Sequence, residues 1–362
     1  MTPYSRSRFE LAVGASSLQQ DSSPSNPLRR RLKLCCRFAA LSGRLLEENF
    51  VSVTHKLQDT WSLILAGGSG ERLKPVVRRW LGQDKPKQYC TFIGTRSMFQ
   101  HTVDRSDRMI APERRVTVIA QDHRDDALPQ LSSRPPGKLV VQPVNRETAA
   151  GVFLGLAHVR NEHPDATVVI IPSDHFVFPE DRFVQATRSL ARAARQMAQW
   201  MFLLAATPDR PETEYGWIQP GANLGRIAGY RVQGATAFIE KPSLEGCEAA
   251  MRSGGLWNTM VMAGKVETLW SLGRQAFPEM MRLFEFYSSS IGTAQEKAVL
   301  ERIYEVMPRH NFSSDLLQKF PERVAIMELL GVLWSDWGKP ERIAETLRYM
   351  GRKPAFSQAQ IA

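Results

Sequence analysis

From residue 61 onward, the chain alternates short apolar runs rich in β-branched residues with longer stretches of helical periodicity. This alternation is typical of an α/β protein, because the parallel strands of a sheet need helical crossovers between them. The predicted strands are 62–66, 116–120, 138–143, 167–174 and 201–207, and the clearest helices are 148–163 and 182–199. After Pro208 we expect strands at 216–221 and 230–242, helices from the 240s to the 300s, a strand at 323–330 and a last helix near 339–349.

The composition is that of a globular protein with a full-sized core, since 43% of its 362 residues are hydrophobic and 23% are charged. The formal net charge is +10, but residues 1–58 hold nine Lys or Arg against four Asp or Glu, about half of the excess. This distribution argues against nucleic acid as a partner of the remaining chain. The positive charge that is left can attract a polyphosphate substrate.

The four cysteines show no CxxC spacing and no paired framework, which favours a reducing compartment, and we therefore expect a cytoplasmic protein. No apolar stretch is long enough to span a membrane, and the sequence predicts no transmembrane segment. Residues 28–50 can form a basic amphipathic helix. We interpret residues 1–58 as a basic extension, either poorly ordered or a surface helix, with membrane or partner docking as the alternative.

The apolar run at 62–66 ends in the sequence GGSGER, whose three glycines let a ligand approach the backbone amides. A phosphate-binding loop has this character. The dinucleotide fingerprint GxGxxG does not fit, because Leu73 stands where its third glycine belongs, and no GxxxxGK[ST] motif occurs in the chain.

Two further predicted strands also end in polar residues, and ligands of open parallel sheets bind at the carboxyl ends of strands. Gln142, Asn145 and Thr148 follow one strand, whereas Ser173 and Asp174 follow the other. Turn formation or helix capping explains Asn145, Thr148 and Ser173 equally well. Asp174 comes directly after an apolar run, so its carboxylate must be solvated, paired or metal-bound.

An ordered set of motifs resembles the sugar-1-phosphate nucleotidyltransferases over roughly residues 60–345. The set comprises LAGGSGERLKP, DKPKQY, QPVNRETAAG, IIPSDH, EYGWI, FIEKP, LWN and WSDWG. PKQ and PSDH resemble the mannose-1-phosphate guanylyltransferases in particular. The resemblance implies a Rossmann-like nucleotide-diphospho-sugar transferase fold with a mostly parallel mixed sheet, and an enzyme that joins GTP to mannose 1-phosphate with release of pyrophosphate.

The resemblance also implies the site. Catalytic roles fall to Arg72 on the β- and γ-phosphates, Lys87 near the α-phosphate and Asp174. The implied nucleotide-binding residues are Gly67, Gly68, Gly70, Gln142, Asn145 and Thr148, and the implied sugar-phosphate residues are Tyr215, Gly216, Glu240, Lys241 and Asn258. Asp174 and Asp336 are implied to bind one Mg²⁺ between them, since a hard cation prefers carboxylate and phosphate oxygens.

Three departures from the mannose branch are visible: Glu71 and Lys74 stand where Thr and Trp are common, and LWNTMVM lacks a glycine after the asparagine. The same reaction with UTP or dTTP and glucose 1-phosphate is therefore the alternative within the enzymes, and a non-catalytic regulatory homologue is the alternative outside them. We expect a catalytic domain at 59–350 and a C-terminal tail at 351–362, and a homodimer is compatible with this organisation.

Overall fold

The computed structural model describes residues 56–135 and 137–357, all within one compact unit, and most of the predicted extension at 1–58 lies outside the described residues. The strands are β1 (Thr60–Ala66), β2 (Arg115–Ala120), β3 (Lys138–Gln142), β4 (Thr167–Pro172), β5 (Phe176–Phe178), β6 (Met201–Ala206), β7 (Gly216–Ile227), β8 (Tyr230–Glu240), β9 (Leu256–Lys265), β10 (Val324–Glu328) and β11 (Leu333–Ser335).

The α-helices are α2 (Lys74–Leu81), α3 (Met98–Met109), α4 (Arg124–Leu131), α5 (Glu147–Glu162), α6 (Glu180–Gln196), α7 (Leu244–Arg252), α8 (Val266–Ala276), α9 (Pro278–Ser288), α10 (Glu296–Val306) and α11 (Pro340–Tyr349). Within the described part of the chain, no helix combines the length and the apolar character needed to cross a membrane.

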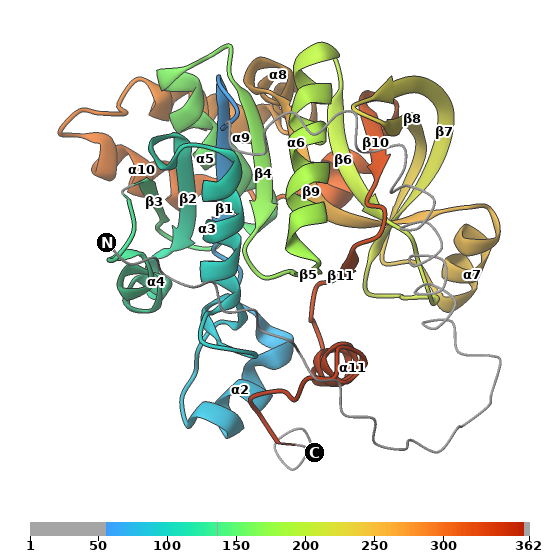
Figure 1. The fold of residues 1–362 in the computed structure, drawn as a ribbon. Coiled ribbons are helices and arrows are strands. Elements are labelled where there is room, and N and C mark those ends of the chain that lie inside the picture. The colour runs from blue at the N-terminus through green and yellow to red at the C-terminus, as the bar shows by residue number, and fades with distance from the viewer. Residues whose placement is uncertain (1–55, 136, 358–362) are drawn as a thin grey trace, which may run out of the picture. The chain divides into compact units, whose positions relative to one another are not determined.

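A nine-stranded mixed sheet organises this unit, in the order β3-β2-β1-β4-β9-β6-β10-β8-β7 (Figure 1). Strands β3, β2, β1 and β4 run parallel to one another, as do β6 and β10. β9 runs antiparallel between β4 and β6, and β7 and β8 form an antiparallel pair at one edge. The predicted α/β fold with a mostly parallel mixed sheet is confirmed.

Both faces of the sheet are covered by helices (Figure 1), so successive residues of its strands alternate between two cores. On β4, Val168 and Ile170 pack into the core formed with α5, α8 and α9, whereas Val169 and Ile171 pack against α6. This two-sided burial explains why the strands read as continuous apolar runs.

The prediction of helices throughout the 240s to 300s is wrong for Leu256–Lys265, which forms β9. This strand is buried on both faces and contains Met, Ala, Asn and Gly, so it shows neither period-2 alternation nor β-branched enrichment. Its pairing with β4 and β6 decides its conformation. β9 carries Asn258 into the sheet beside Ala205, near the carboxyl end of β6.

Candidate active site

The predicted site residues gather at one end of the sheet because several parallel strands end there. The glycine loop follows β1, Gln142 ends β3 and Asp174 follows β4. Ala66 pairs with Ile119 and Ala120 pairs with Gln142, so these strand ends lie at the same edge. Antiparallel strands bring further residues to this end, since Trp257 of β9 pairs with Ala206 at the end of β6.

The glycine loop is hydrogen-bonded to the segment that follows Lys87. Gln88 donates from Nε2 to the carbonyl oxygens of Ala66 and Gly68, at 2.9 and 2.8 Å. Gly70 has a left-handed φ of 63°, and a Cβ there would lie 3.1 Å from the Lys87 backbone nitrogen. A side chain at residue 70 would therefore combine backbone strain with a close contact. The loop and Lys87 are positioned together.

Lys87 links the two carboxylate-bearing segments of the site. Its Nζ lies 2.9 Å from Oδ2 of Asp174 and also donates a hydrogen bond to the backbone carbonyl of Asp336. The Lys87 side chain is only 6% exposed, whereas that of Asp174 is 36% exposed. An ammonium group is thus fixed deep in the site, with a partly accessible carboxylate in front of it.

Arg72 reaches the same cluster from the other side of the glycine loop. Its Nη1 donates to Glu214 Oε2 at 2.7 Å, and its Nη2 donates to Asp336 Oδ2 at 3.2 Å. The guanidinium is about half exposed, so a ligand can compete for it. Because an arginine fork matches phosphate oxygens as well as carboxylates, a triphosphate at the glycine loop can exchange with these two acids.

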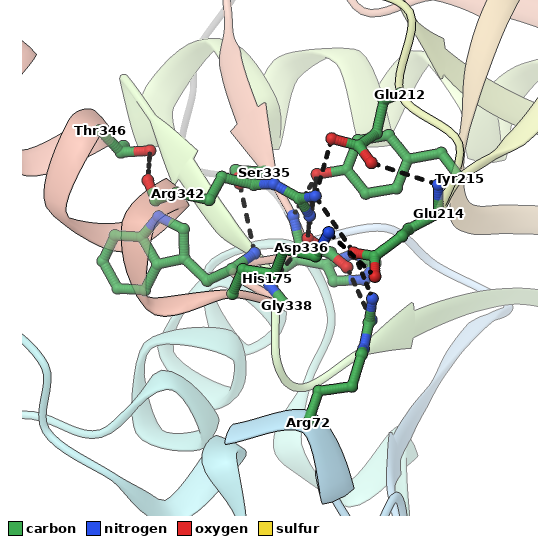
Figure 2. A network of polar contacts seen from close by, with 12 residues as sticks. Arg72, His175, Glu212, Glu214, Tyr215, Ser335, Asp336, Gly338, Arg342 and Thr346 are labelled. Carbon is green, nitrogen blue, oxygen red and sulfur yellow. Dashed lines mark hydrogen bonds and ion pairs between the residues drawn. The ribbon is translucent and has the colours of Figure 1, made fainter. Parts of the chain in front are cut away.

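Asp336 is the centre of a polar network (Figure 2). Its Oδ1 accepts hydrogen bonds from the Tyr215 hydroxyl at 2.9 Å, from the Gly338 amide at 2.9 Å and from Nη1 of Arg342. Arg342 also lies 4.8 Å from the Tyr215 ring centroid and donates from Nη2 to Glu212 at 2.8 Å. The last helix therefore contributes a buried cation to the site.

The electrostatics of the site favour ionised carboxylates. Burial would raise the pKa of Asp336, but Lys87 and Arg342 reverse that effect and hold the pKa well below its usual range. The pKa of Asp174 is also lowered, because Lys87 and His175 outweigh its burial. Both side chains are anions over the physiological pH range.

The three side chains predicted to bind the nucleotide beyond the glycine loop have different partners within the chain. Gln142 donates from Nε2 to the hydroxyl of Tyr304 at 3.3 Å. Asn145 accepts from the Glu147 amide at 2.8 Å through Oδ1, and the Thr148 Oγ1 accepts from a distant backbone amide at 2.8 Å. Oδ1 of Asn145 therefore supports a local turn, as its turn interpretation predicts. Thr148 Oγ1 instead ties the start of α5 to Phe312, 164 positions away, so its capping interpretation does not describe this contact.

The residues predicted to bind the sugar phosphate form a second group around Tyr215. Gly216 pairs with Glu240 across β7 and β8, and a Cβ at residue 216 would lie 2.9 Å from Glu240 Oε2. Lys241 lies 3.6 Å from Glu240, and the backbone amide of Lys241 donates to the Tyr215 carbonyl. Burial raises the pKa of Glu240. The side chain of Asn258 turns back and accepts from the Met260 amide at 2.8 Å.

Backbone strain gathers around these residues. Among the described residues, six that are not glycine have positive φ, and four of them are predicted site residues or lie within two positions of one: Glu147, Lys241, Met260 and Trp337. Such conformations cost free energy and persist where the surrounding structure imposes them, often at functional sites.

The donor set fits a hard divalent cation that also takes phosphate and water ligands. The distance between Asp174 Oδ1 and His175 Nε2 is 3.7 Å, which is too long for a hydrogen bond. Oδ2 of Asp336 is held by Arg72, the guanidinium that a triphosphate can take over. Within the described residues, no group of three or more His, Cys, Asp or Glu side chains forms a metal cluster. A cation held by these two carboxylates would need further ligands, which phosphate oxygens and water can supply.

Sequence reasoning missed the acids and the arginine that surround Asp336. Glu212 and Glu214 flank Thr213 just before Tyr215, and Arg342 lies six residues after Asp336. The sequence signal was present for Arg342, since it falls on the apolar face of a short amphipathic helix, beside Ile343 and Thr346. A charged residue at such a position needs a buried partner.

A mixed α/β sheet with a glycine loop, cations and carboxylates at its strand ends is suited to a phosphate-bearing ligand, and sequence similarity places the chain in a family. The chain belongs to the nucleotidyl transferase family, whose profile matches residues 61–351. The resemblance to sugar-1-phosphate nucleotidyltransferases is confirmed.

Particular relatives are known in bacteria. The chain is 32% identical over 206 residues to the xanthan biosynthesis protein XanB of Xanthomonas campestris pv. campestris (strain B100), a match that covers 56% of this chain and 41% of that protein. It is 24% identical over 282 residues to a mannose-1-phosphate guanylyltransferase of Escherichia coli, covering 76% and 59% respectively. The chain thus spans about two fifths to three fifths of the length of these relatives.

A solved structure from Thermus thermophilus, described as a mannose-1-phosphate geranyltransferase, superimposes with a TM-score of 0.68 and 26% identity. The match covers 82% of this chain and 80% of that one. A Helicobacter pylori structure described as mannose-6-phosphate isomerase shares the fold at 17% identity and a TM-score of 0.61, over 76% of this chain and 99% of that one.

Proposed function

We propose that the chain transfers a guanylyl group from GTP to mannose 1-phosphate, giving GDP-mannose and pyrophosphate. The observation that carries this proposal is the buried Lys87 ammonium, bound at once to the Asp174 carboxylate and to the Asp336 carbonyl beside the glycine loop. Similarity to a mannose-1-phosphate guanylyltransferase supports the choice of substrates.

In the proposed reaction, a phosphate oxygen of mannose 1-phosphate attacks the α-phosphorus of GTP, and pyrophosphate leaves on the opposite side. Two anions must approach each other, so catalysis consists mainly of positioning and charge neutralisation. Lys87 neutralises the α-phosphate, and Arg72 leaves Glu214 and Asp336 for the β- and γ-phosphates. The leaving group then departs with its charge compensated.

Asp174 and Asp336 would hold Mg²⁺, which when bound neutralises phosphate charge without a proton transfer. Glu240, Lys241 and Asn258 would contact the sugar phosphate together with Tyr215 and Gly216. The nucleotide would rest on Gly67, Gly68 and Gly70, with Gln142 near the base. Within the described residues, Cys90 and Cys247 are free thiols, which supports the proposal of a cytoplasmic protein.

A pyrophosphate-release assay tests this function by crossing GTP, ATP, UTP, CTP and dTTP with mannose, glucose and N-acetylglucosamine 1-phosphates. We expect the highest kcat/KM with GTP and mannose 1-phosphate. A preference for UTP or dTTP with glucose 1-phosphate would contradict the guanylyl assignment and leave the family intact. No turnover with any pair would favour the non-catalytic alternative.

A further inference from the structure

One segment far along the chain supports the predicted base-binding residues. The end of α10 and the loop after it, residues 304–312, contact the β3–α5 connection and the first turn of α5. The hydrogen bonds run from Arg146 Nε to the Tyr304 carbonyl at 2.8 Å, from the Ala149 amide to the His310 carbonyl at 3.1 Å, from the Phe312 amide to Thr148 Oγ1 at 2.8 Å and from Arg309 Nη2 to the Asn145 carbonyl at 3.4 Å.

Within this contact, Tyr304 determines which way the Gln142 amide faces. The Tyr304 hydroxyl is fully buried and donates to the Ala150 carbonyl at 3.5 Å, so it can accept only from the NH₂ group of Gln142. The hydrogen-bond network therefore assigns Nε2 to the side of Tyr304 and Oε1 to the opposite side. Burial raises the pKa of Tyr304, which keeps the hydroxyl protonated.

Oε1 of Gln142 lies against the glycine loop. A Cβ on Gly67 would approach Oε1 to 3.0 Å, and a Cβ on Gly151 of α5 would do the same. The absence of side chains at Gly67 and Gly151 thus leaves the space that the Gln142 amide occupies. Gly67 is the first residue of the glycine loop, so the acceptor atom of Gln142 lies where that loop leaves the sheet.

The other candidate side chains in this region already have partners within the chain. Oδ1 of Asn145 accepts from the Glu147 amide, and Oγ1 of Thr148 accepts from the Phe312 amide. The first contact shapes the turn that enters α5, and the second ties the start of α5 to the segment after α10. Oε1 of Gln142 lies beside Gly67 of the glycine loop, so it is the acceptor atom that a base bound at this loop would meet.

We propose that Tyr304 is a positioning residue for base selection, which fixes Gln142 so that its acceptor oxygen faces the bound base. An acceptor at this place pairs with a ring N–H donor, which guanine, uracil and thymine present on their pairing edge and adenine and cytosine lack. A site built to hydrogen-bond a group discriminates against analogues without it, because its own polar atom is then left unpaired. This inference rests on the proposed nucleotide transfer and names the class of base.

The test is Tyr304→Phe, which keeps the buried ring and removes only the hydroxyl. Tyr287→Phe is the matched control, because Tyr287 is equally buried and its hydroxyl contacts His158 and Glu296 rather than Gln142. In Tyr304→Phe we expect the ratio of kcat/KM for GTP over ATP to fall about tenfold. KM for GTP should rise, whereas kcat with GTP and KM for mannose 1-phosphate should stay unchanged.

Gln142→Leu, alone and combined with Tyr304→Phe, completes a double-mutant cycle. If Tyr304 acts through Gln142, adding Tyr304→Phe to Gln142→Leu changes the base ratio no further. An unchanged ratio in Tyr304→Phe, a fall shared with Tyr287→Phe, or a fall in kcat alike for every base would overturn the inference.

Failure of the proposed function gives different results. If the wild-type protein prefers UTP and glucose 1-phosphate, the role of Tyr304 is tested in the same variants by the ratio of kcat/KM for UTP over CTP. If no pair is turned over, equilibrium binding of the five triphosphates to the full chain supplies the ratios. A wild type that binds none of them overturns both proposals.

Discussion

Lys87 Nζ lies 2.9 Å from Asp174 Oδ2, and this ion pair joins the segment after the glycine loop to the residues that follow β4. The glycine loop itself follows β1, which is the neighbour of β4 in the sheet. In the proposed reaction, a cation held in this way would meet the α-phosphate without rearrangement, because the fold has already oriented it.

The first prediction concerns this lysine. Lys87→Met should lower kcat/KM more than about a hundredfold, since the charge that offsets repulsion between the substrates is lost. Lys85→Met is the control, because Lys85 belongs to the same loop but pairs with Asp126 at 3.2 Å. Steady-state kinetics should find Lys85→Met near wild type. Equal losses in both variants would show that the loop, rather than the Lys87 charge, is what matters.

Asp174 gives the second prediction. Asp174→Asn should lower kcat more than about a hundredfold, about 2.7 kcal/mol of transition-state stabilisation, and raise the Mg²⁺ concentration needed for half-maximal rate. Asp122→Asn serves as control, because Asp122 also follows a strand of the sheet but is 83% exposed. Circular dichroism checks that both variants fold. Near-normal Mg²⁺-dependent turnover in Asp174→Asn would remove this residue from the metal site.

The third prediction addresses Arg342, the buried cation beside Asp336. Arg342→Met should lower the free energy of unfolding by about 3 kcal/mol, because Asp336 and Glu212 lose a shared partner in a buried network. Arg342→Lys should recover only part of this loss, since an ammonium cannot reproduce the guanidinium fork. Urea denaturation measures both variants, with Arg348→Met on the exposed side of α11 as control. A loss no larger than that of Arg348→Met would contradict the account.

The fourth prediction is a pH dependence of stability due to His158. Burial, helped by Lys138, lowers the pKa of this histidine from 6.5 to about 4. Between pH 6.5 and about 4, His158 is protonated in the unfolded chain but neutral in the folded protein. The free energy of unfolding is therefore highest above pH 6.5 and falls as the pH drops towards 4. The difference between the two pKa values corresponds to a loss of at most about 3 kcal/mol in the free energy of unfolding.

Urea denaturation at several pH values between about 7 and 4 measures this effect. His158→Gln should be less stable at neutral pH, because the hydrogen bond between His158 Nε2 and the Tyr287 hydroxyl changes. Its stability should nevertheless fall less steeply on acidification than that of the wild type. Parallel pH profiles would show that His158 titrates normally in the folded protein.

Much of the sheet could be predicted from the sequence because its parallel strands are apolar runs that end in recognisable polar residues. The run TVVIIP, for example, forms β4, which ends just before Ser173. β9 could not be predicted in the same way, because its conformation depends on pairing with β4 and β6, which lie far away in the sequence. β9 begins at Leu256, which is 89 positions after the first residue of β4, Thr167, and 55 positions after the first residue of β6, Met201.

The site shows the same division. The resemblance to known motifs predicted Lys87, Asp174 and Asp336 as site residues, and the structure links these three through a hydrogen bond and an ion pair. Tyr304 and Arg342 reach the site only through tertiary packing, the first from the end of α10 and the second from α11. A single sequence carries no local signal that a tyrosine will meet Gln142, 162 positions away.

The central claim is that this chain makes a nucleotide sugar from GTP and mannose 1-phosphate. Mass spectrometry of the products formed by the purified full chain with both substrates and Mg²⁺ tests it most directly. We predict GDP-mannose and pyrophosphate in equal amounts, with product formation lost in Asp174→Asn. Absence of GDP-mannose from a folded wild-type protein that binds GTP, or undiminished formation of GDP-mannose by Asp174→Asn, would contradict the account.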